Sequence, residues 1–287
     1  MRTLLITVAL ILAGYSYLLA LPAANHPQSI AFYQPDAFSV IAHGNGRALM
    51  PGNTLEAGVH ALAVGADILE LDIHLTVDNH LVVRHDDIID TTTNGAGVIA
   101  EMTLAAIQQY DVGFHKIDYP KLVGPDGLVV PTLESLFQQL PESRFLIELK
   151  PENTDAADRL CSLITQYAMA KQVVVGSFHS SVLQYFRTTC PSVPTSLGQT
   201  EVISLLALSV LGLAHLYESP GVSVQLPWRY GGVTFLSASL VDILHSLNLK
   251  IEVWTVNDPA IMRALINMGV DGVITDRPDI LDQLILL

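Results

Sequence analysis

The sequence predicts an α/β fold, a (β/α)8 TIM barrel with a β-hairpin inserted after its second strand and a hydrophobic helix at its N-terminus. Short apolar runs alternate with helical stretches along residues 38–287, the order expected of repeated βαβ units. Most of these runs are apolar on both faces, as buried parallel strands are. A segment of this length suits one barrel domain. We therefore expect a barrel at 38–287, a linker at 25–37 and an apolar segment at 1–24.

Nine apolar runs indicate strands, one more than an eight-stranded barrel uses. They lie at residues 40–43, 68–73, 81–85, 145–150, 173–177, 195–198, 222–226, 251–256 and 272–275. Helical stretches between many of them lie at residues 54–64, 133–140, 156–167, 238–247 and 259–268. Thr54 and Asp258 are suited to begin helices, and Pro259 suits a first helical turn.

A hairpin accounts for the surplus strand. Asp78 and Asn79 both tolerate left-handed backbone geometry, which favours a two-residue turn between the second run and the third. The run at 81–85 then folds back antiparallel on the strand before it. In this register Asp72 lies opposite His85, with their Cβ atoms about 5 Å apart. Eight barrel strands remain.

Titratable side chains gather at the C-terminal ends of three consecutive strands, the edge at which a barrel carries its active site. They are His43 on the first strand, Glu70 and Asp72 on the second, His85 on its returning partner, and Glu148 and Lys150 on the next. Alternation puts the two residues of each strand on one face. An isolated charged pair or strand-end histidine is usually structural, but buried strands rarely carry charges without partners. The convergence of these groups therefore predicts a functional site.

The residue types at this site indicate metal-assisted chemistry on a phosphodiester. Oxygen ligands from Glu70, Asp72 and Glu148 suit one divalent cation, Mg²⁺ or Ca²⁺, whereas zinc prefers His and Cys. Such a cation can hold the non-bridging oxygens of a phosphodiester, and Lys150 can add a positive contact. The two histidines can serve as general base and general acid because their pKa lies near neutral.

Charge and hydropathy bear on partners and location. The net charge of −14 excludes the basic footprint of a nucleic-acid-binding protein. Residues 3–21 are almost all apolar and follow Arg2, so they predict either an uncleaved signal anchor or a cleaved signal peptide. Arg2 orients the chain so that the catalytic domain lies on the non-cytoplasmic side of a membrane, or is secreted or periplasmic after cleavage.

Two further features leave alternatives open. The apolar run at 202–216 cannot cross a membrane without dividing the barrel, so it is either a buried helix or an apolar surface that dips into the membrane interface. The two cysteines, Cys161 and Cys190, are expected to be ordinary buried thiols. A disulfide between them requires an oxidising compartment and a short distance between their Cα atoms.

Seven segments resemble, in their order, those of the glycerophosphodiester phosphodiesterase family. They are IAHG at 41–44, PGNTLEA at 51–57, GADILELDIHLTVDNHLVVRHD at 65–86, IELKPE at 147–152, GSF at 176–178, VWTVND at 253–258 and GVDGVITDRPD at 269–279. The resemblance implies a TIM barrel with His43 and His85 as the acid/base pair. It also implies three carboxylate ligands for one cation, Lys150 near the phosphate, and Phe178 and Trp254 near the pocket mouth.

The chain departs from the family pattern at three positions. Gly44 stands where the family usually has Arg, and Arg47 is a candidate to replace that phosphate contact. Gly52 stands where the family usually has Glu, although the neighbouring Asn53 remains. Thr91 occupies a position that is often Arg. These changes imply an altered substrate, weaker metal binding or loss of activity.

Family members hydrolyse a glycerol-based diester to a glycerol phosphate and an alcohol. The apolar segments at 1–24 and 202–216 resemble the membrane-associated branch, whose members act as lysophospholipase D and release the head group to leave lysophosphatidate. We therefore expect a lysophospholipid substrate, with soluble glycerophosphodiesters next. The alternatives are a sphingomyelinase-D-like phospholipase, which releases cyclic phosphates, and a non-catalytic membrane-anchored binding module.

Overall fold

The structure is a computed structural model that describes residues 2–286 except 29, 35–36, 114–124, 126, 233 and 235. The strands are β1 (Ser39–Ala42), β2 (Ile68–Leu75), β3 (Leu81–Val83), β4 (Arg144–Leu149), β5 (Val173–Gly176), β6 (Ser223–Pro227), β7 (Lys250–Trp254) and β8 (Gly272–Thr275). The helices are α1 (Arg2–Leu19), α2 (Leu55–Ala63), α3 (Leu104–Ile107), α4 (Leu133–Gln139), α5 (Thr154–Gln166), α6 (Ser180–Thr189), α7 (Gln199–Val210), α8 (Ala238–Ser246), α9 (Pro259–Met268) and α10 (Pro278–Ile285).

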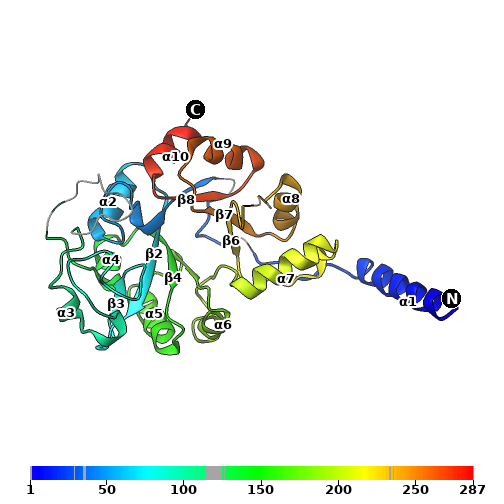
Figure 1. The fold of residues 1–287 in the computed structure, drawn as a ribbon, viewed down its shortest axis with the longest axis horizontal. Helices are drawn as coiled ribbons and strands as arrows, with labels where there is room; N and C mark the ends of the chain where they lie inside the picture. The colour runs from blue at the N-terminus through cyan, green and yellow to red at the C-terminus, as the bar shows by residue number, and fades with distance from the viewer. Residues whose placement is uncertain are drawn as a thin grey trace.

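The strands form the predicted barrel (Figure 1). Their order is β5-β4-β2-β1-β8-β7-β6, with every neighbouring pair parallel, and β3 pairs antiparallel with β2 outside this path. Two isolated parallel bridges close the ring, since Thr195 pairs with Val175 of β5 and Ser196 pairs with Ser223 of β6. The predicted strand at 195–198 is therefore reduced to two bridging residues. The fold class is confirmed.

Local sequence explains where the helices begin. The Thr54 hydroxyl accepts a hydrogen bond from the Ala57 backbone N–H at the start of α2, and Asp258 caps α9 directly before Pro259. The predicted helices at 54–64, 133–140, 156–167, 238–247 and 259–268 correspond to α2, α4, α5, α8 and α9. Helices α3, α6 and α10 were not among them.

The hairpin exists, but its predicted register was wrong by one residue. Ile73 pairs with Val83 and Leu75 with Leu81, and the Thr76 N–H donates to the His80 carbonyl oxygen, so the three residues at 77–79, rather than two, form the loop. Asn79 adopts a left-handed conformation (φ 65°), as the last residue of a three-residue hairpin loop commonly does. The residue opposite Asp72 is therefore Arg84, not His85.

Apolar side chains fill the barrel and extend beyond it into the segment that precedes β1. Inside the strands, one buried cluster joins Ile41, Ile68 and Leu146 to Phe32 and Tyr33. These two aromatic residues come from the segment at 25–37 and pack against the ends at which the strands begin. Larger clusters lie between the strands and the surrounding helices.

Helix α1 extends away from the barrel and lies beside the end of α7 (Figure 1). The Tyr15 hydroxyl donates a hydrogen bond to the carbonyl oxygen of Leu211 (2.7 Å), and the Ala24 N–H donates to that of His215 (2.8 Å). Within the residues that the structure describes, no helix combines the length and the apolar character needed to cross a membrane.

The apolar run at 202–216 forms most of α7 and the turn that follows it. Leu205 in α7 and Leu213 and Ala214 after it are buried, whereas Ile203, Val210 and Leu211 are exposed, Val210 by 88%. Of the two alternatives, the run is therefore not a fully buried helix. It presents apolar side chains on the surface.

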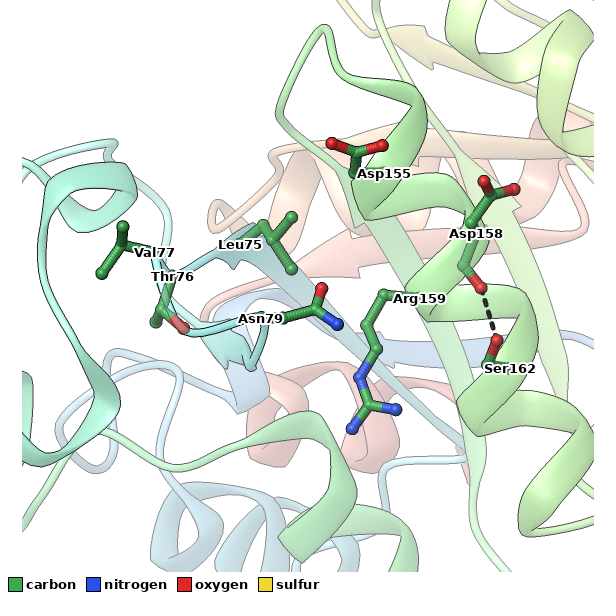
Figure 2. A pocket seen from close by; sticks show the side chains of 8 residues that line it. All are labelled: Leu75, Thr76, Val77, Asn79, Asp155, Asp158, Arg159 and Ser162. Atoms are coloured by element: carbon green, nitrogen blue, oxygen red, sulfur yellow. Dashed lines mark hydrogen bonds between the residues drawn. The ribbon is translucent and has the colours of Figure 1, made fainter.

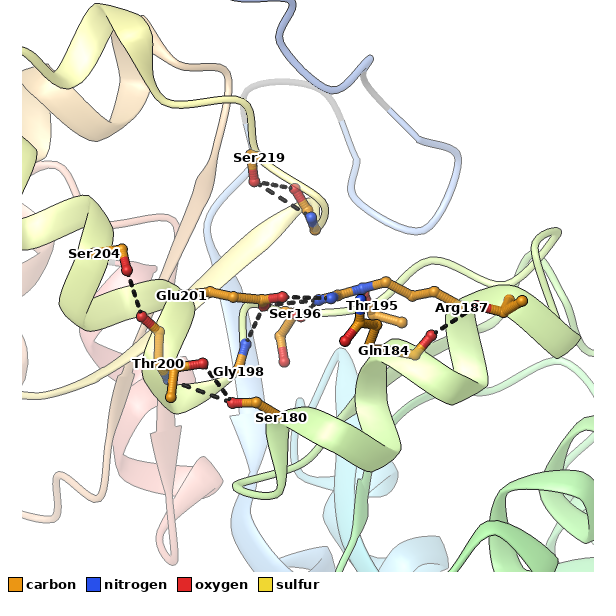
Figure 3. A network of polar contacts seen from close by, with 12 residues as sticks. Ser180, Gln184, Arg187, Thr195, Ser196, Gly198, Thr200, Glu201, Ser204 and Ser219 are labelled. Carbon is orange, nitrogen blue, oxygen red and sulfur yellow. Dashed lines mark hydrogen bonds and ion pairs between the residues drawn. The ribbon is translucent and has the colours of Figure 1, made fainter.

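A polar network fixes the start of α7 (Figure 3). Arg187 at the end of α6 binds both carboxylate oxygens of Glu201, at 2.6 and 3.0 Å, and also donates to the Thr195 hydroxyl (2.7 Å). The Glu201 carboxylate accepts a further hydrogen bond from the Gly198 N–H. This bidentate ion pair links α6 to α7, and the hydrogen bond to Thr195 links both helices to the bridge that closes the barrel. The contacts therefore fix the position of α7, with its exposed side chains, relative to the barrel.

The prediction of two free thiols was wrong. Cys161 in α5 and Cys190, which follows α6, form a disulfide with their Cα atoms 5.7 Å apart. Helices α5 and α6 pack against each other, and this packing brings together cysteines that are 29 residues apart in the chain.

Candidate active site

Three carboxylates meet inside the barrel at the C-terminal ends of β2 and β4. Glu70 and Asp72 share one face of β2 by alternation, and Asp72 pairs with Glu148 of β4 in the parallel register. One ligand oxygen from each lies within 4.8 Å of the others, a grouping able to hold a metal ion. The sequence therefore predicted this cluster correctly.

The electrostatics of the cluster fit a cation. Burial and the neighbouring Asp72 charge raise the pKa of Glu70 to about 8, and burial also raises the pKa of Glu148. Burial opposes ionisation of Asp72 as well, but Lys150, His85, His43 and the hydrogen bond from Asn53 together outweigh it, and the pKa of Asp72 is lowered. A site of three hard oxygen ligands with excess negative charge suits Mg²⁺ or Ca²⁺.

Lys150 contacts two of the three carboxylates. Its Nζ lies 3.1 Å from Asp72 Oδ1 and 2.9 Å from Glu148 Oε1. Burial alone would lower the pKa of Lys150, but these two carboxylates raise it, so the amine is charged. The predicted proximity of Lys150 to the carboxylates is present in the structure.

His43 follows β1 and is held by a carboxylate that sequence reasoning missed. Its Nδ1 lies 2.6 Å from Oδ1 of the buried Asp276, which follows β8. Burial alone would lower the pKa of His43, but the hydrogen bond to Asp276 and the charge of Glu70 raise it. Asn257 donates to the other oxygen of Asp276 (2.7 Å). A carboxylate directly after a barrel strand was the signal that could have identified Asp276.

His85 lies beyond β3, with a carboxylate partner of its own. Its Nδ1 is 2.8 Å from Oδ1 of Asp86, and its backbone carbonyl faces the ring nitrogen of His74 (3.1 Å). Thr91, at the position that is often Arg in the family, donates a short hydrogen bond to Asp86. It makes this contact without the positive charge that an arginine would bring. His85 is half exposed, and its charge helps to lower the pKa of Asp72.

The loop between β1 and α2 supplies two neutral contacts to the carboxylates. The Gly44 N–H donates to Glu70 Oε2 (2.8 Å), and the Asn53 amide donates to Asp72 Oδ2 (3.1 Å). Arg47 lies on the other side of the loop, where its Nε donates to Asp276 (2.9 Å). Asn53 thus contacts a ligand of the candidate metal site directly, whereas Arg47 contacts the partner of His43.

Phe178 and Trp254 form an aromatic pair at the C-terminal ends of β5 and β7. Their ring centroids are 6.1 Å apart and the planes meet at 85°, an edge-to-face contact. Phe178 is 52% exposed. The two residues implied at the pocket mouth therefore touch each other, and one of them presents an apolar surface to solvent.

A separate hollow lies outside the barrel, between the tip of the hairpin and α5 (Figure 2). Its volume is about 520 Å³, and it is lined by Leu75, Thr76, Val77, Asn79, Asp155, Asp158, Arg159 and Ser162. None of these residues is a predicted site residue. Arg159 projects from α5 and lines this hollow together with Asn79.

Comparison with known proteins decides the family. The model of the "Glycerophosphoryl diester phosphodiesterase family" matches residues 43–280. The chain belongs to this family. It is therefore a phosphodiesterase, and the barrel edge just described is the candidate active site of a glycerophosphodiester phosphodiesterase.

Individual relatives agree with this assignment. YhdW of Bacillus subtilis is 32% identical over 245 residues, which cover 84% of this chain and 95% of YhdW. The mouse lysophospholipase D GDPD1 is 25% identical over 264 residues, 83% of either chain. A crystal structure of a family protein from Silicibacter pomeroyi superposes with a TM-score of 0.75 at 26% identity, covering 89% of this chain and 95% of that one.

Proposed function

We propose that this phosphodiesterase hydrolyses a glycerol-based phosphodiester at the cluster of Glu70, Asp72 and Glu148, with one divalent cation, Mg²⁺ or Ca²⁺, as its cofactor. The observation that carries the proposal is the grouping of three ligand oxygens within 4.8 Å at the C-terminal edge of the barrel. A cation bound there supplies a contact for non-bridging phosphoryl oxygens and stabilises developing negative charge.

The two histidines would move the protons. Each has its Nδ1 engaged by a carboxylate, His43 by Asp276 and His85 by Asp86, which leaves Nε2 as the atom that exchanges a proton. One histidine takes the proton of the attacking hydroxyl, which in a glycerol diester is the neighbouring hydroxyl of the substrate. The other gives a proton to the leaving alcohol oxygen. The cyclic phosphate is then opened by water to a glycerol phosphate.

The apolar surfaces support a lysophospholipid as the substrate, which makes the enzyme a lysophospholipase D. Ile203 and Val210 of α7 are exposed, and so is Leu211 directly after it, whose carbonyl oxygen accepts a hydrogen bond from Tyr15 of α1. Leucine and isoleucine side chains of α1 are exposed as well. Such a surface favours contact with a lipid layer. Phe178 at the barrel edge offers an apolar contact to an acyl chain. The similarity to a mouse lysophospholipase D points in the same direction.

Membrane association with the catalytic domain on the non-cytoplasmic side completes the proposal. The segment at 1–24 would act as a signal anchor or a signal peptide, and the residues at 25–37 would connect it to the barrel. The disulfide between Cys161 and Cys190 supports this location because disulfides persist in oxidising compartments.

Head-group release by detergent-solubilised full-length protein tests the proposal. Glycerophosphocholine and lysophosphatidylcholine would be compared with Mg²⁺, with Ca²⁺ and with EDTA, beside the variant His43→Ala. The matched control is His60→Ala, because His60 is an exposed histidine on α2. We expect metal-dependent choline release, mainly from the lysolipid, which is lost in His43→Ala and kept in His60→Ala.

The other outcomes separate the parts of the proposal. Choline release mainly from glycerophosphocholine would keep the diesterase and overturn the lipid preference. A cyclic phosphate as the final product would indicate the sphingomyelinase-D-like alternative. Absence of release from both substrates would favour the non-catalytic binding module and contradict the proposed function.

A further inference from the structure

Arg84 is a buried cation next to the candidate metal site. It directly follows β3, its side chain is only 3% exposed, and its Nη1 is enclosed without any hydrogen-bond partner among the described residues. Burial lowers the pKa of Arg84 to about 10, although the charges of Asp86 and Asp72 act in the opposite direction. Neither carboxylate therefore compensates fully for the loss of water around the guanidinium.

The hairpin register places this side chain on the face of the carboxylates. The Arg84 backbone N–H donates to the carbonyl oxygen of Asp72 (3.0 Å), so the two residues lie opposite each other across β2 and β3. Cross-strand partners share a face, and Glu70 and His74 share that face of β2 by alternation. Arg84 therefore points to the side of the hairpin that carries the candidate active site.

The other cations of the site are already engaged by carboxylates. Lys150 contacts Asp72 and Glu148, and Arg47 contacts Asp276. A divalent cation together with Lys150 would neutralise the three carboxylates, which leaves the single negative charge of a bound phosphodiester without a counterpart. Arg84 supplies a positive charge to this balance.

We propose that Arg84 binds a phosphoryl oxygen of the substrate through the guanidinium edge that includes Nη1. A buried nitrogen without an acceptor is costly, and an arginine fork matches the geometry of a phosphoryl group. The inference rests on the proposed function, since it needs a phosphodiester beside Asp72. The inference assigns the phosphate contact to Arg84 of the hairpin, and not to Gly44 or Arg47 in the loop between β1 and α2.

Binding of an anion can be measured without turnover. Inorganic phosphate and sn-glycerol 3-phosphate would be titrated by calorimetry into the full-length protein with Mg²⁺, and thermal unfolding would be followed with and without each anion. The variant Arg84→Met removes the charge and keeps much of the volume. The matched control is Arg159→Met, since Arg159 has a buried Nε without a partner but lines the separate hollow outside the barrel (Figure 2).

We expect Arg84→Met to weaken binding of both anions by about 10- to 100-fold, the effect of losing a charge-assisted contact. The melting temperature without anion should stay the same or rise, because a buried, uncompensated charge has been removed. The rise in melting temperature that phosphate produces in the parent protein should be lost. Arg159→Met should bind both anions as the parent does. Arg84→Lys, which keeps the charge but not the fork, should show a smaller loss of affinity.

A purely structural role for Arg84 gives the opposite pattern. If Arg84→Met melts at a lower temperature without anion but still responds to phosphate like the parent, the inference is wrong. It is equally wrong if Arg84→Met and Arg84→Lys both keep the parent affinity, or if the parent binds neither anion. Loss of anion binding in Arg84→Met, in a parent that binds phosphate but releases no head group, would instead support Arg84 and reject the proposed diesterase substrate.

Discussion

Glu252, at the ends where the barrel strands begin, should make the stability of the protein depend on pH. Its carboxyl is 1% exposed and accepts hydrogen bonds from the Tyr33 hydroxyl (2.6 Å), the Gln225 amide (3.1 Å) and the Ser223 hydroxyl (3.4 Å). Burial raises the pKa of Glu252 from 4.5 to about 7, although these hydrogen bonds act to lower it. Asp271 is the neighbouring charge that raises it further.

The sign of the effect follows from proton binding. Between the unfolded pKa of 4.5 and the folded pKa of about 7, the folded protein holds a proton that the unfolded chain has released. The stabilising contribution of Glu252 is therefore fully present below the unfolded pKa and is lost as the pH rises through the folded one. At about 1.4 kcal/mol per pKa unit, the loss between roughly pH 5 and pH 8 amounts to about 2.5 kcal/mol.

Urea unfolding of the parent protein and of Glu252→Gln at the two pH values measures this contribution. The neutral amide cannot titrate, so the parent should lose about 2.5 kcal/mol more of its unfolding free energy than the variant does between roughly pH 5 and pH 8. EDTA in all samples keeps the metal site in the same state. The exposed Glu142→Gln is the control and should behave like the parent. Equal pH dependence in the parent and in Glu252→Gln would refute the reasoning.

Three further predictions concern the site and the disulfide. Glu70→Ala should remove metal-dependent activity while the circular dichroism spectrum stays that of the parent, and a folded variant with full activity would contradict the metal assignment. Asp276→Asn should reduce kcat by roughly two orders of magnitude or more, because His43 loses its charged partner; the limb of the pH–rate profile that reports His43 should move to lower pH, and an unchanged profile would exclude this role. Replacing Cys161 and Cys190 with serine should lower the unfolding free energy by about 3 kcal/mol, measured by urea titration, and equal stability would show that the disulfide contributes nothing.

The sequence was sufficient for the barrel and for the existence of the hairpin, but not for the register of the hairpin. Asp78 and Asn79 suit a two-residue turn, and they equally suit a three-residue loop that ends in a left-handed Asn79. Local residue preferences therefore do not separate the two registers. The pairing of β3 with β2 in the folded protein decides between the two registers. It also decides whether His85 or Arg84 lies opposite Asp72.

The carboxylate cluster was predictable because alternation and strand order determine it. Glu70 and Asp72 share a face in any strand, and Glu148 lies on the next strand of the barrel. The Asp276 partner of His43 required one further step, since the two residues are 233 positions apart and meet because closure of the barrel pairs β1 with β8. The disulfide was not predictable in this way, because it depends on how α5 packs against α6 and not on strand order or on the spacing of its cysteines.

The departures from the family pattern at Gly44 and Gly52, in the loop between β1 and α2, are one linked change. Gly44, Asn45 and Gly46 all have positive φ (51°, 62° and 82°), a path that favours glycine and disfavours a larger residue at position 44. This path brings Arg47 against Gly52, where an added Cβ would lie 2.6 Å from the Arg47 Cβ. A glutamate at position 52 is therefore incompatible with Arg47 as it lies here. The absence of an arginine at position 44 and of a carboxylate at position 52 both follow from the backbone path of this loop, so neither is by itself a sign of a degraded active site.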